Sequence, residues 1–167
     1  MSELLTLKKN ALVAHPNGGF SFGTIPEMPK FDLPGGEVYL RVGEHFRAGR
    51  GFGVVHIWEA HHPDLLKHGC MTIDEVAAHI AKMIVPGAQI YCEFKEQRGA
   101  GHRVAVLRSS TGTLILEPRH DRDLGFAYHV ITWYPQRRAY GTLVGNIPRQ
   151  RPVATAQPVA PVEPNSK

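Results

Sequence analysis

The chain has few cysteines and no long apolar run, and both absences limit what it can be. The two cysteines, Cys70 and Cys92, are too few for a disulfide framework and form no Cys-x-x-Cys pair. No stretch of about 18 consecutive apolar residues occurs, so we predict no membrane-spanning helix and no membrane partner. The first residues lack a basic segment followed by an apolar one, so no secretory signal is predicted. A reduced, cytoplasmic protein is therefore expected.

A strong excess of charge of one sign is also missing. The 167 residues include 19 Lys and Arg against 15 Asp and Glu, a net charge of +4, and residues 36–147 hold 13 basic and 11 acidic side chains. This balance does not by itself indicate a nucleic-acid-binding protein. Ten of those 13 basic residues are Arg, however, which suits bidentate contacts with phosphate or carboxylate.

The distribution of proline and glycine divides the chain into three zones. Residues 1–35 hold scattered Pro, Gly and aromatic residues, which predicts an irregular N-terminal extension. Residues 148–167 carry five of the 13 prolines and no aromatic residue, which is typical of a disordered or polyproline tail. With 43% hydrophobic residues overall, the segment 36–147 between them is expected to fold as one domain.

Two helical segments are predicted early in this domain. A strand at 37–42 and a Gly-rich loop at 43–53 lead into a helix that begins at 54, and Pro63 is expected to interrupt it. Farther on, Thr72 and Glu75 have the spacing of a capping box at the start of a second helix, which Pro86 would end.

After residue 88 the hydrophobic period changes to two, which is typical of strands separated by short turns. Such a series predicts an antiparallel meander with the helices on one face. The expected fold class is therefore α+β, with N-terminal helices packed on one face of an antiparallel sheet of four to five strands. The predicted strands are 89–94, 103–108, 113–117, 126–134 and 142–147.

Ten histidines in one small chain raise the question of a metal site. The spacing of His56, Glu59 and His61 does not match the His-Glu-x-x-His pattern of catalytic zinc sites. Five residues rotate a helix by about 500°, so His56 and His61 would point in different directions. We therefore predict neither a metal site nor a cofactor.

A more informative group lies in the Gly-rich loop and the helix that follows it. His45, Arg47, Arg50 and His56 place two imidazoles and two guanidiniums close together in sequence. RNA cleavage without metal needs such groups: one imidazole takes the proton of the ribose 2′-hydroxyl, another protonates the leaving 5′-oxygen, and a guanidinium balances the charge on phosphorus. The alternative that the loop is polar only for solubility, with His56 packed beside Trp58, stays open.

Two later segments hold further candidates for a substrate pocket. Arg108, Ser110 and Thr111 belong to a turn rich in hydroxyl and N–H groups that is suited to an anion. Thr132 and Tyr134 follow on a strand and would contact a phosphate or a base if their face looks into a groove. Strict alternation puts Phe126, Tyr128, Val130, Thr132 and Tyr134 on one face, and His129, Ile131 and Trp133 on the other.

The order of these motifs resembles the phage-associated branch, type 3, of the barnase/EndoU/colicin/RelE-like nuclease superfamily. The resemblance covers about residues 36–147 and leaves both ends of the chain unexplained. The matching motifs are Gly43-Glu-His45, Arg50-Gly, His56-Ile-Trp-Glu-x-His61, Pro86-Gly, Arg108-Ser-Ser-Thr-Gly-Thr113, Val130-Ile-Thr132 and Gly141-Thr-Leu-Val-Gly145.

The resemblance implies a function and a set of roles. It implies a metal-independent endoribonuclease of the kind used as a toxin or phage effector, with RNA as substrate. His45 and His56 become acid/base candidates and Arg50 a phosphate binder, while Thr132 and the Ser110–Thr111 turn are secondary pocket residues. The Pro-rich tail would join or dock another protein, and an inhibitor is a further possible partner.

Two other functions fit parts of the sequence. An ADP-ribosyltransferase would use an Arg, a Ser-Thr pair and a later Glu in that order, here Arg41, Ser110 with Thr111, and Glu117. A phage protein that binds nucleic acid or a partner without catalysis would fit the nearly balanced charge of residues 36–147. Consumption of NAD would identify the first, and RNA binding without cleavage the second.

Overall fold

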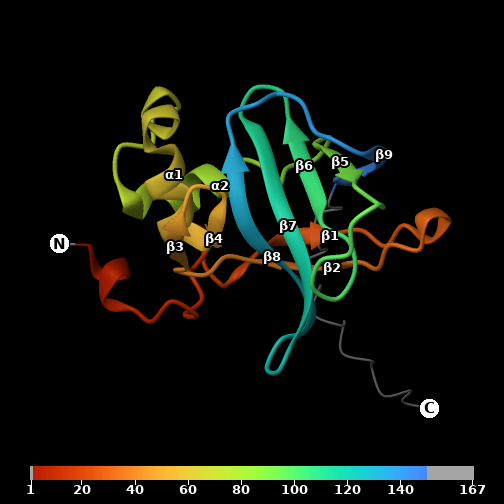
Figure 1. The fold of residues 1–167 in the computed structure, drawn as a ribbon, viewed down its shortest axis with the longest axis horizontal. Coiled ribbons are helices and arrows are strands. Elements are labelled where there is room, and N and C mark those ends of the chain that lie inside the picture. The colour runs from red at the N-terminus through yellow and green to blue at the C-terminus, as the bar shows by residue number, and fades with distance from the viewer. Residues whose placement is uncertain (1, 150–167) are drawn as a thin grey trace, which may run out of the picture.

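The computed structural model describes residues 2–149, and Figure 1 shows two helices beside a large curled sheet. None of the helices within residues 2–149 has the length and apolar character needed to cross a lipid bilayer. The predicted Pro-rich tail lies, from residue 150 onward, outside the described residues.

The elements are β1 Ser21–Ile25, β2 Gly36–Tyr39, β3 Glu44–Arg47, β4 Arg50–Phe52, α1 Gly53–Lys67, α2 Val76–Ala81, β5 Gln89–Cys92, β6 Val104–Arg108, β7 Gly112–Asp121, β8 Gly125–Tyr134 and β9 Thr142–Asn146, with short 3-10 turns at Glu3–Thr6, Pro29–Phe31 and Ile73–Glu75.

The expected fold class is wrong, because strands dominate the molecule and the sheet is larger and mixed. Seven strands pair in the order β1-β2-β8-β7-β6-β5-β9. Strands β5 to β8 form the antiparallel meander that the alternating pattern indicates. Strand β2, however, pairs with β8 in parallel, and β9 returns to pair with the far side of β5. The sheet is therefore not an antiparallel one of four to five strands.

Three strands extend the sheet beyond the meander of β5 to β8, and two of them, β2 and β9, pair with strands far away in the chain. Residues 1–35, expected to be irregular, contribute β1, which pairs with β2. The pairing of β2 with β8 joins Val38 to Tyr128 and Tyr39 to His129, about 90 residues apart. Local alternation indicates that a strand forms, but the burial of its apolar face against distant strands selects its partner.

The predicted Gly-rich loop is a β-hairpin of β3 and β4. Glu44 lies opposite Phe52 and His45 opposite Gly51. Gly43 has φ +81°, and a Cβ there would collide with the backbone carbonyl of Phe52. The glycines therefore allow two backbone segments to approach closely, so they shape a hairpin instead of a flexible loop.

The two helices also differ from their predicted form. Helix α1 continues through Pro63 to Lys67, whereas the proline was expected to interrupt it. Helix α2 is only six residues long, preceded by the 3-10 turn Ile73–Glu75. The capping box does not form: the Thr72 side chain makes no capping bond, and the Glu75 carboxylate accepts from the backbone N–H of Met71 at 2.6 Å.

A β-bulge in β8 overturns the predicted alternation of that strand. Leu116 pairs with Val130 but Ile115 pairs with Thr132, so Ile131 is an extra residue on β8. Past this point the faces exchange. Val130 and Trp133 both point into the core, at 1% and 0% exposure, although strict alternation separates them. Thr132 then lies on the face opposite Trp133.

The core fills the space between one face of the sheet and the helices. Trp133 is fully buried there, with the His79 ring of α2 at 4.6 Å between centroids. His79 is itself 3% exposed. Both cysteines are buried and free, and burial raises the pKa of each thiol to about 11. A raised pKa makes a thiol less reactive, because less of it is present as the thiolate.

Leu116 provides a test of this core. Its side chain in the middle of β7 is fully buried, so Leu116→Ala should lower the free energy of unfolding by about 2–5 kcal/mol. Leu143→Ala, at a half-exposed leucine of β9, is the matched control and should change it by about 0.5 kcal/mol or less. Urea denaturation followed by circular dichroism measures both, and equal losses would contradict the assigned core.

Candidate functional site

A pocket of about 470 Å³ opens where the β3–β4 hairpin and the start of α1 meet the sheet face opposite the helix-packed core. We call it the His56 pocket. Strands β7 and β8 contribute its sheet side, the hairpin its outer wall, and the segment before β6 its remaining edge. It is lined by Phe46, Gly49, Arg50, Gly51, Phe52, His56, Arg98, Arg103, Arg119, Ile131, Thr132 and Tyr134.

His56 lies in the first turn of α1 and is directly bonded to a second imidazole. Its Nδ1 is 3.0 Å from Nδ1 of His45 on β3, and the two rings stack with centroids 5.2 Å apart. Burial lowers the pKa of His56 to about 4, with further lowering by the charges of His45 and His61. His56 is therefore neutral at pH 7. With Nδ1 bonded to His45, its Nε2 is the nitrogen left to bind a substrate proton.

Thr132 brings an unpartnered hydroxyl to the same pocket. The β8 bulge turns this residue away from the core, and its side chain is 4% exposed. Its Oγ1 has no hydrogen-bond partner within residues 2–149. A buried hydroxyl without a partner carries a free-energy cost, which a bound ligand oxygen would remove.

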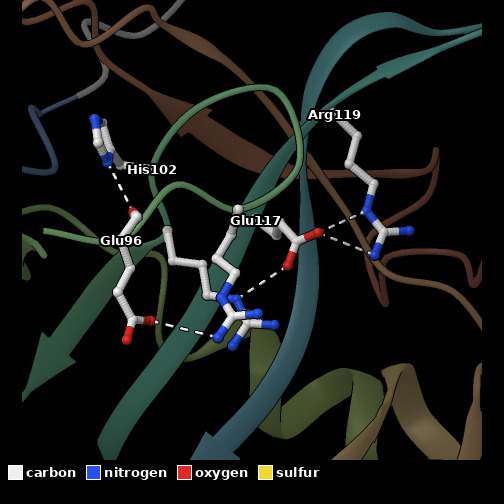
Figure 2. Close-up of polar contacts among 6 residues, drawn as sticks. Glu96, His102, Glu117 and Arg119 are labelled. Atoms are coloured by element: carbon white, nitrogen blue, oxygen red, sulfur yellow. Dashed lines mark hydrogen bonds and ion pairs between the residues drawn. The ribbon is translucent and has the colours of Figure 1, made fainter. Parts of the chain in front are cut away.

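A buried carboxylate orients two of the pocket arginines. Glu117 on β7 is 7% exposed and accepts from Nε of Arg103 at 3.0 Å and from Nε of Arg119 at 3.2 Å. Figure 2 shows the carboxylate of Glu117 directed toward the guanidinium of Arg119. Each guanidinium keeps further N–H donors for a ligand. Arg98, from the loop before β6, is held more loosely by Glu96 at 3.5 Å.

The hairpin supplies a fourth arginine and an exposed ring. Arg50 lines the pocket, is exposed, and has no acidic partner among the ion pairs of residues 2–149. Arg47 lies opposite Arg50 in the hairpin register but does not line the pocket. Phe46, also on the pocket wall, is 64% exposed. The hairpin therefore presents an unpaired cation and an aromatic face to a ligand.

The structure brings together only part of the predicted set. His56, Arg50, Thr132 and Tyr134 line one pocket, and His45 supports it through His56. The turn of Arg108, Ser110 and Thr111 does not line it. Arg108 donates to the backbone carbonyl of Lys82 at 2.6 Å, and the hydroxyls of Ser110 and Thr111 lie 3.3 Å from each other.

Arg41, the residue that the ADP-ribosyltransferase alternative requires, is bonded to other side chains of the fold. Its Nη2 is 2.7 Å from Oδ2 of Asp121, and its Nε lies 3.4 Å from Nδ1 of His129. It lines neither the His56 pocket nor the neighbouring one that shares Arg98 and Arg103. The guanidinium thus joins the end of β7 and the middle of β8 to the segment after β2.

Sequence reasoning missed three arginines of the site, and it considered Glu117 only for the ADP-ribosyltransferase alternative. Arg98, Arg103 and Arg119 line the pocket, and Glu117 orients two of them. A partial signal existed, because Glu117 and Arg119 alternate along one strand and so share a face. Nothing in the spacing indicated that Arg103 would lie beside them, since that depends on the β6–β7 register.

No family model, curated protein or solved structure matches this chain in comparisons with known proteins. Within residues 2–149 there is also no group of three or more His, Cys, Asp or Glu side chains arranged to hold a metal ion. Function must therefore be argued from the chemistry of the site itself.

The buried histidines predict how stability changes with pH. Burial lowers the pKa of His56, His79 and His129 to about 4 each, below the value near 6.5 of the unfolded chain. Between these values the unfolded chain binds protons that the folded chain does not, so the free energy of unfolding should fall as pH drops from 6.5 toward 4. Above pH 6.5 the free energy of unfolding should no longer depend on these histidines' titration.

Urea denaturation at pH 7 and at pH 4.5 measures this loss. His79→Gln should show a smaller difference between the two pH values than the wild type, whatever its absolute stability. If His79→Gln does not fold, His129→Gln serves the same purpose. An unchanged difference in a folded variant would contradict the assignment.

Proposed function

We propose that this protein is a metal-independent endoribonuclease that cleaves RNA at the His56 pocket. The observation that carries the proposal is the grouping, in one pocket, of a neutral histidine, an unpartnered buried hydroxyl and four arginines. A neutral imidazole accepts a proton, and guanidiniums and a hydroxyl donate to phosphate oxygens. Attack of a ribose hydroxyl on its own phosphodiester needs these groups and no external nucleophile.

The reaction can be written with this chain's residues. Nε2 of His56 takes the proton of the ribose 2′-hydroxyl, and O2′ forms a bond to phosphorus. Arg50, Arg103 and Arg119 stabilise the negative charge that develops on the nonbridging oxygens. The bond from phosphorus to O5′ breaks, and O5′ receives a proton. The products are a 2′,3′-cyclic phosphate and a 5′-hydroxyl.

Tyr134 is assigned as the group that protonates the leaving oxygen. Apart from the arginines, His56 and Tyr134 are the two side chains lining the pocket that can transfer a proton. The edge contact of Tyr134 with the His61 ring, at 5.3 Å between centroids, restrains its side chain. This assignment replaces a second catalytic imidazole, because His45 does not line the pocket.

His45 acts as a positioning residue in this mechanism. When His56 donates its Nδ1–H to Nδ1 of His45, the tautomer with a free Nε2 lone pair is selected. The same bond stabilises the imidazolium that forms when His56 takes up the substrate proton. His45→Ala should therefore lower kcat while leaving KM nearly unchanged.

One alternative is a protein that binds RNA at the same pocket without cleaving it. The cleavage assay described below distinguishes this alternative from a nuclease. The ADP-ribosyltransferase reading gains no support, since Arg41 is bonded to Asp121 and Glu117 is bonded to two arginines. Membership of the barnase/EndoU/colicin/RelE-like superfamily, which the sequence motifs suggest, is a part of this proposal.

Cleavage of mixed cellular RNA by the purified protein tests the proposal. We expect cleavage that persists in EDTA and leaves 2′,3′-cyclic phosphate ends. His56→Ala should reduce the rate by about 10²- to 10⁴-fold, as expected for loss of a general base. His120→Ala is the matched control, because His120 is exposed and lines neither pocket.

Three outcomes would contradict the proposal in different ways. Loss of cleavage in EDTA would show that the reaction needs a metal ion, which the histidines would then bind. Equal effects of the His56 and His120 substitutions would remove His56 from the chemistry. Binding of RNA with no cleavage in any buffer would identify a non-catalytic binding protein.

Glu117→Gln tests whether the arginines are held in place by the buried carboxylate. The amide keeps the shape of the side chain but loses the charge that fixes Arg103 and Arg119. We expect kcat/KM for RNA to fall by about tenfold, since hydrogen bonds to charged groups contribute about 1.5–3 kcal/mol. Glu59→Gln, at an exposed residue of α1, is the control and should leave kcat/KM unchanged. An unchanged kcat/KM in Glu117→Gln would contradict this role.

A further inference from the structure

A second pocket of about 450 Å³ lies directly beside the His56 pocket on the same sheet face. We call it the Tyr140 pocket. Arg98, Arg103 and Tyr134 line both pockets, so the two are adjacent, and we refer to them together as the groove. The proposed mechanism places no part of the substrate in this second pocket.

The floor of the Tyr140 pocket is a row of side chains that ends at the catalytic site. Tyr91 pairs with Ala105, Ala105 with Ile115, and Ile115 with Thr132. Paired residues of neighbouring strands lie on the same face, so this row crosses the sheet from β5 to β8. Adjacent strands are about 4.8 Å apart, which puts the Ala105 position about 10 Å from Thr132.

Exposed aromatic rings are concentrated along this groove. Tyr140 is 80% exposed, Phe46 64% and Tyr134 37%, and all three line one or both of the pockets. Among residues 2–149 only one other large aromatic side chain, Phe20, reaches a comparable exposure. Rings that remain uncovered beside a basic pocket are suited to stack on nucleobases.

The charges in the Tyr140 pocket favour a neutral base over a second phosphate. Arg98 and Arg103 lie at the boundary with the His56 pocket, where the scissile phosphate would bind. Glu93, Glu96 and Arg138 line the rest of the pocket, where two carboxylates therefore stand against one guanidinium. The carboxylates of Glu93 and Glu96 disfavour a second phosphate and accept hydrogen bonds from the N–H groups of a base.

We infer that the Tyr140 pocket binds the nucleobase next to the scissile phosphate, stacked on Tyr140 and on the Tyr91 floor. The inference rests on the proposed nuclease function and defines its substrate class as single-stranded RNA. A base that enters this pocket has to leave its stack and its pairing partner, so duplex RNA of the same sequence is a poor substrate.

The test uses a single-stranded RNA decamer, the same decamer in a perfect duplex, and a single-stranded DNA decamer that lacks the attacking 2′-hydroxyl. Wild-type protein should cleave the single-stranded RNA at least tenfold faster than the duplex. Tyr140→Ala should raise KM for the single strand by about 5- to 150-fold, the range for one lost stacked base, with kcat little changed. Because Tyr140 is 80% exposed, its removal should leave the fold intact.

Phe20→Ala is the matched control, since Phe20 is 50% exposed and lines neither pocket. Cleavage by the wild type with an unchanged KM in Tyr140→Ala and in Tyr91→Ala would overturn the inference and leave the nuclease proposal standing. Equal effects of the Phe20 and Tyr140 substitutions would also overturn it.

The DNA decamer separates the two proposals if no RNA is cleaved. Fluorescence anisotropy of a labelled DNA decamer should then show binding that Tyr140→Ala weakens and Phe20→Ala does not. That result would support the base pocket and reject only the catalytic mechanism. Absence of binding by the wild type would reject the base pocket.

Discussion

The extra residue in β8 is the constraint on which the candidate site depends. Leu116 pairs with Val130 and Ile115 with Thr132, so the strand turns over at Ile131. One result is that Trp133 enters the core, where it is fully buried between the sheet and the helices. The other is that Thr132 and Tyr134 face the groove. Without the bulge, the tryptophan that anchors the helices and the hydroxyl that faces the ligand would exchange places.

The His56 pocket holds a neutral imidazole and several positively charged guanidiniums side by side. Burial lowers the pKa of His56 to about 4, with further lowering by the charges of His45 and His61, so its imidazole is neutral at pH 7. The four arginines that line the pocket give it a positive field, which favours a phosphodiester. Glu117 prevents the arginines from repelling one another and leaves part of each guanidinium free for a ligand. The pocket thus places a neutral imidazole beside several guanidinium donors.

Sequence patterns predicted the short-range features well and the long-range ones poorly. The strands from 89 to 146 appear at nearly the predicted positions, because alternation of apolar residues is a local property. The predicted α+β sheet of four to five antiparallel strands was wrong, because β1 and β2 add to the sheet, β2 pairs with the distant β8 in parallel, and β9 pairs with the far side of β5. The long second helix was also wrong: its capping residues bond elsewhere, and a 3-10 turn takes its first residues.

For the candidate site, the sequence by itself determined which groups are present and placed His45, Arg50 and His56 close together, since they lie within 12 residues of one another. Only the tertiary structure decided which distant residues join them. Arg103, Arg119 and Glu117 meet at the pocket because the β6–β7 register brings the start of β6 beside β7, and the loop before β6 adds Arg98, whereas the turn at Arg108 lies at the other end of β6. Register is fixed by burying one face of every strand at once, a condition on the whole sheet that no spacing along the chain records.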